Sequence, residues 1–310
     1  MDYSTLTGAL FDATPMQPNQ LRSGVEDVWS AYQASRFGYV TTRLPSLLAG
    51  ARVALHEAAA ENDRREARRV LALAYHAAAA TLTKVGEADL SWIASDRGLA
   101  AAEQAEDSTV LAALLRSVGH SMLANGRCVT AAAVVARATT RLEATRRSDP
   151  TWWSLLGSLH LVGAMAAARA DEASEARTFL TRARQASERL GHDANHAWTA
   201  FGPTNVAVHD VSVALELGDV QIALDLAPRV DARAFPVERR VRHALESARI
   251  YSRANRQDEA VTTVLHAERD APRQVRYHYI AQELVVSWMS NRRTRGRADV
   301  GALAQWLHIA

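Results

Sequence analysis

Apolar residues recur at spacings of three and four along most of this chain, which is the pattern of amphipathic helices. Residues 172–190 give the clearest example, since Ala176, Phe179, Leu180 and Ala183 fall on one stripe. Alternating β-branched runs and Asn-Gly or Asp-Gly hairpin signals between such runs are missing from the sequence. The pattern therefore predicts an all-α protein.

The predicted helices are separated by similar turns at intervals of about forty residues, a period typical of helical-hairpin solenoids. Paired in order, they predict a right-handed superhelix of about seven tetratricopeptide-like hairpins over residues 21–310, after an N-terminal extension over residues 1–20. The concave face of such a stack is its usual binding surface. The predicted helices cover residues 21–34, 40–60, 64–84, 87–105, 108–124, 129–144, 150–169, 172–190, 194–217, 220–230, 236–254, 258–267, 272–289 and 300–307.

Composition narrows the setting in which the protein works. The net charge of +2 over 310 residues gives no reason to expect a polyanionic partner. A single cysteine, Cys128, rules out an intrachain disulfide and indicates a reducing compartment. The sequence shows neither a signal-peptide pattern nor an apolar run of about 20 residues. We therefore expect a cytoplasmic protein without a membrane partner.

Catalytic and metal-binding motifs are weak in this sequence. It holds no phosphate-binding loop of the form GxxxxGK[ST], no strand-linked GxGxxG and no GxSxG elbow. His192 and His196 are four residues apart, but a glycine-capped turn separates them from a regular helix and no glutamate supplies a base. We expect no enzyme, no metal and no cofactor.

Two segments carry a resemblance to a known family. Residues 28–48, VWSAYQASRFGYVTTRLPSLL, and residues 198–219, WTAFGPTNVAVHDVSVALELGD, resemble the C-terminal regulatory half of actinobacterial XRE-type helix-turn-helix transcriptional regulators. The resemblance implies a tetratricopeptide-like sensing and dimerisation region, joined in that family to a DNA-binding domain. A helix-turn-helix domain needs roughly 55–65 residues, and far fewer precede the first predicted helix. We expect direct DNA binding only if such a domain is added.

The same region holds the main candidate binding residues. On a helix over residues 194–217 they would form one aromatic and polar stripe, kinked or restarted at Pro203. The side chain of Asn205 can donate and accept at once, which suits the backbone of an extended peptide. The alternative is that the stripe makes contacts between repeats. The candidates are Trp198, Phe201, Asn205, His209 and Ser212, with Glu216 one turn further on.

Other predicted first helices offer residues that could face the same groove. Arg68 and Tyr75 are two turns apart on one helix, and Trp153 lies in the first turn of the predicted helix 150–169. Each has the alternative interpretation of packing or solvated surface. The remaining tryptophans are interpreted as core or interface residues.

Three hypotheses for function remain open. The first is a regulatory domain that binds a peptide, a small effector or a protein partner in its groove. The second is an interaction scaffold without an effector. The third is a nucleic-acid binder that uses its arginine clusters. A homodimer could form if the last hairpin exposes Trp288, Trp306 and Leu307. The arginine clusters are Arg64, Arg65, Arg68 and Arg69, and Arg292, Arg293, Arg295 and Arg297.

Overall fold

The computed structural model describes residues 16–145 and 147–309, which fold almost entirely into helices. Within these ranges the only extended pairing is an isolated bridge between Ala194 and Phe201. The predicted all-α fold is confirmed. The α-helices are α2 (Pro18–Gln33), α3 (Phe37–Glu57), α4 (Glu61–Lys84), α5 (Ala88–Ala105), α6 (Ser108–Ala124), α7 (Cys128–Glu143), α8 (Pro150–Arg169), α9 (Ala173–Leu190), α10 (Pro203–Glu216), α11 (Val220–Leu226), α12 (Val237–Arg253), α13 (Gln257–Asp270), α14 (Pro272–Tyr277), α15 (Tyr279–Ser290) and α16 (Ala298–Trp306).

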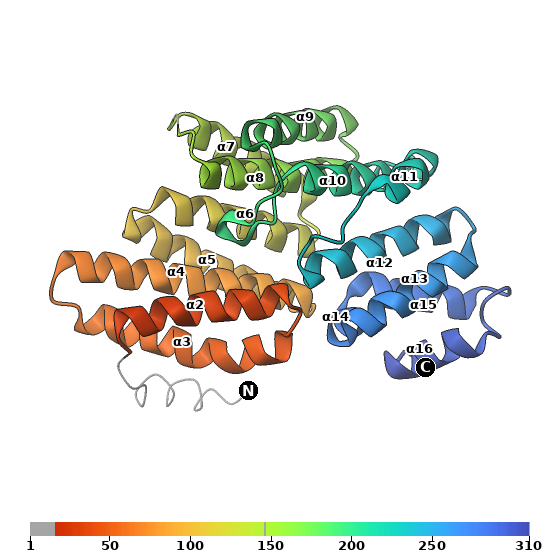
Figure 1. Cartoon of the computed structure of the whole chain (residues 1–310), viewed down its shortest axis with the longest axis horizontal. Helices are drawn as coiled ribbons and strands as arrows, with labels where there is room; N and C mark the ends of the chain where they lie inside the picture. The colour runs from red at the N-terminus through yellow and green to blue at the C-terminus, as the bar shows by residue number, and fades with distance from the viewer. Residues whose placement is uncertain (1–15, 146, 310) are drawn as a thin grey trace.

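Successive helices form antiparallel hairpins that stack into a right-handed, tetratricopeptide-like superhelix, as predicted (Figure 1). Six of the turns share one capping geometry, in which the second residue after the helix takes a left-handed conformation. At the end of α4, Gly86 has φ of 84° and the Glu87 N–H donates to the Leu82 carbonyl at 2.9 Å. The same bond closes the turns at Arg36, Arg127, Glu172, Asp219 and Arg256.

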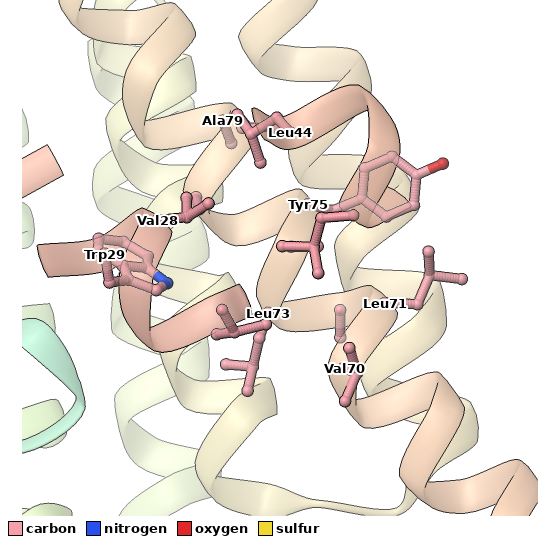
Figure 2. Close-up of a cluster of buried hydrophobic side chains, with 14 of the residues drawn as sticks. Val28, Trp29, Leu44, Val70, Leu71, Leu73, Tyr75 and Ala79 are labelled. Carbon is pink, nitrogen blue, oxygen red and sulfur yellow. The ribbon is translucent and has the colours of Figure 1, made fainter. Parts of the chain in front are cut away.

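Apolar side chains fill the spaces between neighbouring hairpins in a series of clusters along the stack. Figure 2 shows the first, in which α2, α3 and α4 meet around Trp29 and Leu73. Tyr75 belongs to this cluster and is only 8% exposed. The expectation that Tyr75 faces a groove is therefore wrong, because its side chain is buried in this cluster, with its Cβ close to Gly98 of α5.

The superhelix curls until its first hairpin meets its last ones (Figure 1). The Ser35 hydroxyl, after α2, donates to the Gln274 side chain of α14 at 2.6 Å, and both residues are buried. Gln274 in turn donates to the Glu238 carbonyl of α12 at 2.9 Å. These contacts bring the first and last hairpins together across the concave side of the stack.

Two predicted helices are interrupted in the structure. Residues 194–217 do not form one helix, because the chain after α9 makes only a short 3-10 turn, His196–Trp198, and Pro203 then starts α10. Residues 272–289 divide at His278, whose side chain accepts from the Ile280 N–H and caps α15. Most of the predicted extension over residues 1–20 lies outside the described residues, and residues 18–20 belong to α2.

The last hairpin covers its own apolar residues. Trp288 is fully buried and Leu307 is 6% exposed. Trp306 packs against the same cluster, with the Arg276 guanidinium 5.7 Å from its ring centroid. The exposed end that suggested a homodimer is absent from the described residues, and the homodimer stays a prediction without that support.

Candidate functional site

A cavity of about 290 Å³ lies at the centre of the curl, where α4, α5, α6, α8, α10, α12 and α15 converge. We call it the central cavity. Its wall combines apolar side chains with histidines, arginines and one carboxylate. Lining residues include His120, Met165, Arg169, His209, Arg242 and Tyr279.

A second hollow of about 60 Å³, which we call the side chamber, adjoins the central cavity. Trp29, Tyr32 and Trp198 form its aromatic wall, and Arg116 and Glu238 face it from α6 and α12. The two spaces share wall residues, so a ligand in the central cavity could extend a small group into the side chamber. The shared residues are Thr83, His120, Arg239 and Arg242.

Three of the predicted stripe residues line the central cavity, namely Asn205, His209 and Ser212. His209 Nδ1 lies 2.9 Å from the Asn205 carbonyl, so this nitrogen carries the proton and donates. Burial lowers the pKa of His209 to about 3, against the opposing effect of that hydrogen bond. The ring is therefore neutral, and its Nε2 remains available as an acceptor.

Asn205 also has a structural task that the sequence did not indicate. Its side-chain amide donates to the Ala200 carbonyl at 2.9 Å, and Asn205 is only 2% exposed. The bond ties the start of α10 to the segment before it. Of the two predicted roles of Pro203, a kink or a new start, the structure shows the start of α10. The Thr199 carbonyl, four residues earlier, accepts from Arg239 at 3.5 Å.

The segment between α9 and α10 crosses the concave side and reaches α2. The indole of Trp198 stacks on Trp29 with 5.1 Å between ring centroids and 7° between the planes. Asn195 and Gln33 exchange two amide hydrogen bonds of 2.9 Å. Ala197 and Trp198 take left-handed conformations, with φ of 48° and 56°, which such contacts can maintain. Trp198 therefore lines the side chamber, away from the predicted stripe.

Phe201 is a core residue, contrary to its prediction as a groove residue. Its side chain is fully buried, and its ring occupies the space where a side chain on Gly157 would lie. Gly157 permits α8 to pass close to the segment before α10. Phe201 therefore anchors this segment to the stack.

Two further predicted residues lie away from the central cavity. Arg68 is at the outer end of α4, where it bonds to Glu61 at 3.1 Å and to the Gln104 carbonyl at 3.4 Å. Trp153 lines a surface depression between α7, α8 and α9 that also includes His160. This depression shares no lining residue with the central cavity.

Apart from Glu216, the ionic groups in and beside the central cavity were not predicted from the sequence. Glu216, one turn beyond Ser212, lies 3.2 Å from both Arg169 and Arg249. Arg249 also contacts Glu246 at 3.0 Å, and Arg242 contacts Glu246 at 3.2 Å. Burial alone would raise the pKa of Glu216, but the two arginines beside it lower that pKa. These charges form one continuous network, of which Arg169, Arg242 and Glu246 line the central cavity.

A buried ion pair joins α4 to α12 across the closure. Lys84 Nζ lies 2.5 Å from Glu238 Oε1, with side-chain exposures of 11% and 3%. Burial acts to raise the pKa of Glu238, but Lys84 and Arg239 lower it to about 2. Burial lowers the pKa of Lys84 to about 8, in opposition to Glu238. Both groups are charged at neutral pH.

The nucleic-acid and metal hypotheses find little support among the described residues. Arg65 and Arg69 of α4 are paired with Glu106 at 2.9 Å and with Asp107 at 3.0 Å. Arg297 of the late cluster is paired with Asp299. Within residues 16–145 and 147–309, no three His, Cys, Asp or Glu side chains are grouped so that they could hold a metal ion. In the same ranges, no helix combines the length and apolarity needed to cross a membrane.

Comparison with known proteins supports the fold. No family model matches the chain, and no curated protein matches it in sequence. Among solved structures, the fold is similar to that of a Rap protein complexed with Competence and Sporulation Factor, with a TM-score of 0.61. The sequences are 11% identical, and the match covers 86% of this chain and 67% of that chain. The similarity establishes a helical-repeat fold, and the ligand must be argued from the cavity itself.

Proposed function

We propose that this protein is a regulatory helical-repeat domain that binds a small effector or a short peptide segment in the central cavity. The observation that carries the proposal is the convergence of seven helices, α4, α5, α6, α8, α10, α12 and α15, on one cavity with both apolar and polar walls. Its volume of about 290 Å³ is at the lower end of ligand-binding pockets. The similarity to a Rap protein solved with a bound factor supports the same class of function.

The enclosure favours a ligand-responsive domain over a passive scaffold. An effector in the central cavity would touch α6, α8, α10 and α12 at once, so its binding free energy would depend on how these helices are stacked. A scaffold for a partner helix would need an open face instead. We infer that ligand binding alters the stacking of neighbouring hairpins and thereby the surface offered to a partner.

The link to transcription is a further part of the proposal. It rests on the resemblance of residues 28–48 and 198–219 to regulatory regions of XRE-type regulators. In the structure these two segments meet, since Trp29 stacks on Trp198. Co-purification with a DNA-binding protein, or loss of control over a reporter promoter on deletion of the gene, would test it.

The central cavity can be tested by filling it. Val208 lies in its wall and is 9% exposed, so Val208→Phe should occupy part of the space. Protein purified from its own cell and analysed by native mass spectrometry should retain a small molecule or peptide. We expect Val208→Phe to lose it, with an affinity at least about tenfold weaker, or ~1.4 kcal/mol.

The matched control is Val129→Phe, at a position on α7 that is 72% exposed. It makes the same change in composition away from the cavity and should retain the ligand. Equal retention by both variants would contradict the proposal. A protein partner bound equally by both, with no small ligand, would instead favour the scaffold.

A further inference from the structure

Arg116 is a buried cation without a partner among residues 16–145 and 147–309. It lies in the middle of α6, is 6% exposed, and its Nε has no hydrogen-bond partner. No hydrogen bond or ion pair joins its guanidinium to any other residue that the structure describes. An isolated buried charge is costly, and arginine stays charged in proteins. Arg116 nevertheless lines the side chamber, where a ligand could reach it.

The side chamber holds more positive than negative side chains. Arg116, Lys84, Arg239 and Arg242 line it, while Glu238 is its only carboxylate among the described residues. Glu238 is already engaged by Lys84 at 2.5 Å and by Arg239 at 3.5 Å. The chamber therefore has an uncompensated positive charge, concentrated at Arg116.

His120 and Tyr32, the other titratable groups of the side chamber, do not change its excess of positive charge. His120 lies in the wall shared by the two spaces, and burial, followed by the nearby Arg116, lowers its pKa well below the ordinary value. Tyr32 faces the chamber from α2, and burial, followed by Glu238, raises its pKa. Both groups are neutral at physiological pH, so only an added anion would balance the arginine.

The size and walls of the chamber define what it can take. A volume of about 60 Å³ is enough for a few water molecules or one carboxylate-sized group. The stacked indoles of Trp29 and Trp198 close one side, and the passage to the central cavity runs beside Arg239 and Arg242. A group bound here must be small, and its stem must lie in the central cavity.

We propose that the side chamber binds an oxyanion, a carboxylate or a phosphate, carried by the ligand whose body occupies the central cavity. The inference rests on the proposed function and adds the chemical class of the ligand. The guanidinium of Arg116 donates to the oxyanion, and Arg242 and Arg239 flank it at the entrance. Guanidinium groups match both oxyanions in geometry, so the two sources share this chemistry.

The first test measures the ligand-free protein. Replacing an unpaired buried cation with an apolar side chain of similar length removes a charge that nothing compensates. Arg116→Met should therefore raise the Tm of the ligand-free protein by about 2–4 °C. The matched control is Arg249→Met, which removes one of the two arginines that contact Glu216 and one of the two that contact Glu246, and should lower the Tm. A lower Tm for Arg116→Met would show a structural role and overturn the proposal.

The second test measures binding with simple probes. Tm is recorded against acetate, inorganic phosphate, trialanine and trialanine amide, at constant ionic strength and pH. We expect acetate or phosphate to raise the Tm of the wild type in a concentration-dependent way, and Arg116→Met to weaken this response at least about tenfold. A stronger response to trialanine than to its amide would identify a peptide carboxylate as the source.

The outcomes separate this proposal from the proposed function. If no oxyanion shifts the wild-type Tm, or if Arg116→Met responds equally, the oxyanion site is overturned. The central cavity would still stand if Val208→Phe releases a neutral ligand. If Val208→Phe and Val129→Phe behave alike while acetate still requires Arg116, the proposed function fails and the oxyanion site remains.

Discussion

The arginines of α4 and the cations around the central cavity are chemically alike but lie in different surroundings. Arg65 has a side chain that is 48% exposed and pairs with Glu106 across a solvated surface. Lys84, at the other end of the same helix, is 11% exposed and pairs with the buried Glu238. The comparison teaches that burial and pairing, more than the number of basic residues, distinguish a working site from a solvated face.

The largest expected effect comes from breaking the buried pair. Glu238→Gln leaves the charge of Lys84 buried without a carboxylate and should lower the free energy of unfolding by about 3–5 kcal/mol. Urea unfolding monitored by circular dichroism measures the loss. The matched control is Glu61→Gln on the outer end of α4, for which we expect a loss below about 1 kcal/mol. Equal losses would erase the contrast between the two regions.

A drop in pH should affect the cavity more than the outer surface. Burial, as the largest cause, lowers the pKa of His209 to about 3 and that of His120 well below its ordinary value. The unfolded chain binds these protons near pH 6.5. The contribution of the neutral, buried histidines to the free energy of unfolding is therefore fully present above that pH, and it is lost as the pH drops toward the folded pKa.

With a folded pKa of about 3, His209 contributes a loss of up to about 2 kcal/mol at pH 5. Urea unfolding at pH 7, 6 and 5 should show a slope that His209→Gln reduces. An unchanged slope in that variant would mean that His209 takes up its proton in the folded state without cost.

The smallest effect is expected on the outer face. Arg65→Ala removes contacts with Glu61 and Glu106 that water already screens, so the free energy of unfolding should change by less than about 1 kcal/mol. The change should shrink further at high salt. A large loss that persists at high salt would mean that the ion pairs of Arg65 stabilise the protein as much as the buried pair of Lys84 and Glu238.

Most of the fold could be predicted because it depends on local signals. The period of three and four residues and the recurrent capping turns, as at Gly86 and Gly126, are properties of short segments. The prediction of one helix over residues 194–217 was wrong in its bounds, but of the two roles left open for Pro203, a kink or a new start, the structure has the new start, which is common for Pro at a first helical turn. The meeting of α2 with α12 depends on the accumulated curvature of the stack, which no local pattern reports.

The site was only partly predictable for the same reason. Asn205, His209 and Ser212 share a face of α10, and their spacing brings them to the central cavity. Trp198 and Phe201 precede α10, so the spacing of helical residues does not determine where their side chains lie. Arg116 carried one usable signal, since it is the only charged residue in the apolar sequence VLAALLRSVGHSML of α6. A lone charge at such a position indicates a buried cation, but its lack of a partner appears only in three dimensions.

The contact between Ser35 and Gln274 changes how the molecule comes apart. An open array of repeats behaves as a one-dimensional chain of units, in which the terminal units fray first and cooperativity declines with length. Here the first unit is held by the sixth and seventh, and Lys84 with Glu238 adds a second tie between distant parts of the sequence. The first hairpin is therefore held on two sides, so loss of α12 or α14 removes support both from its neighbours in the chain and from α2.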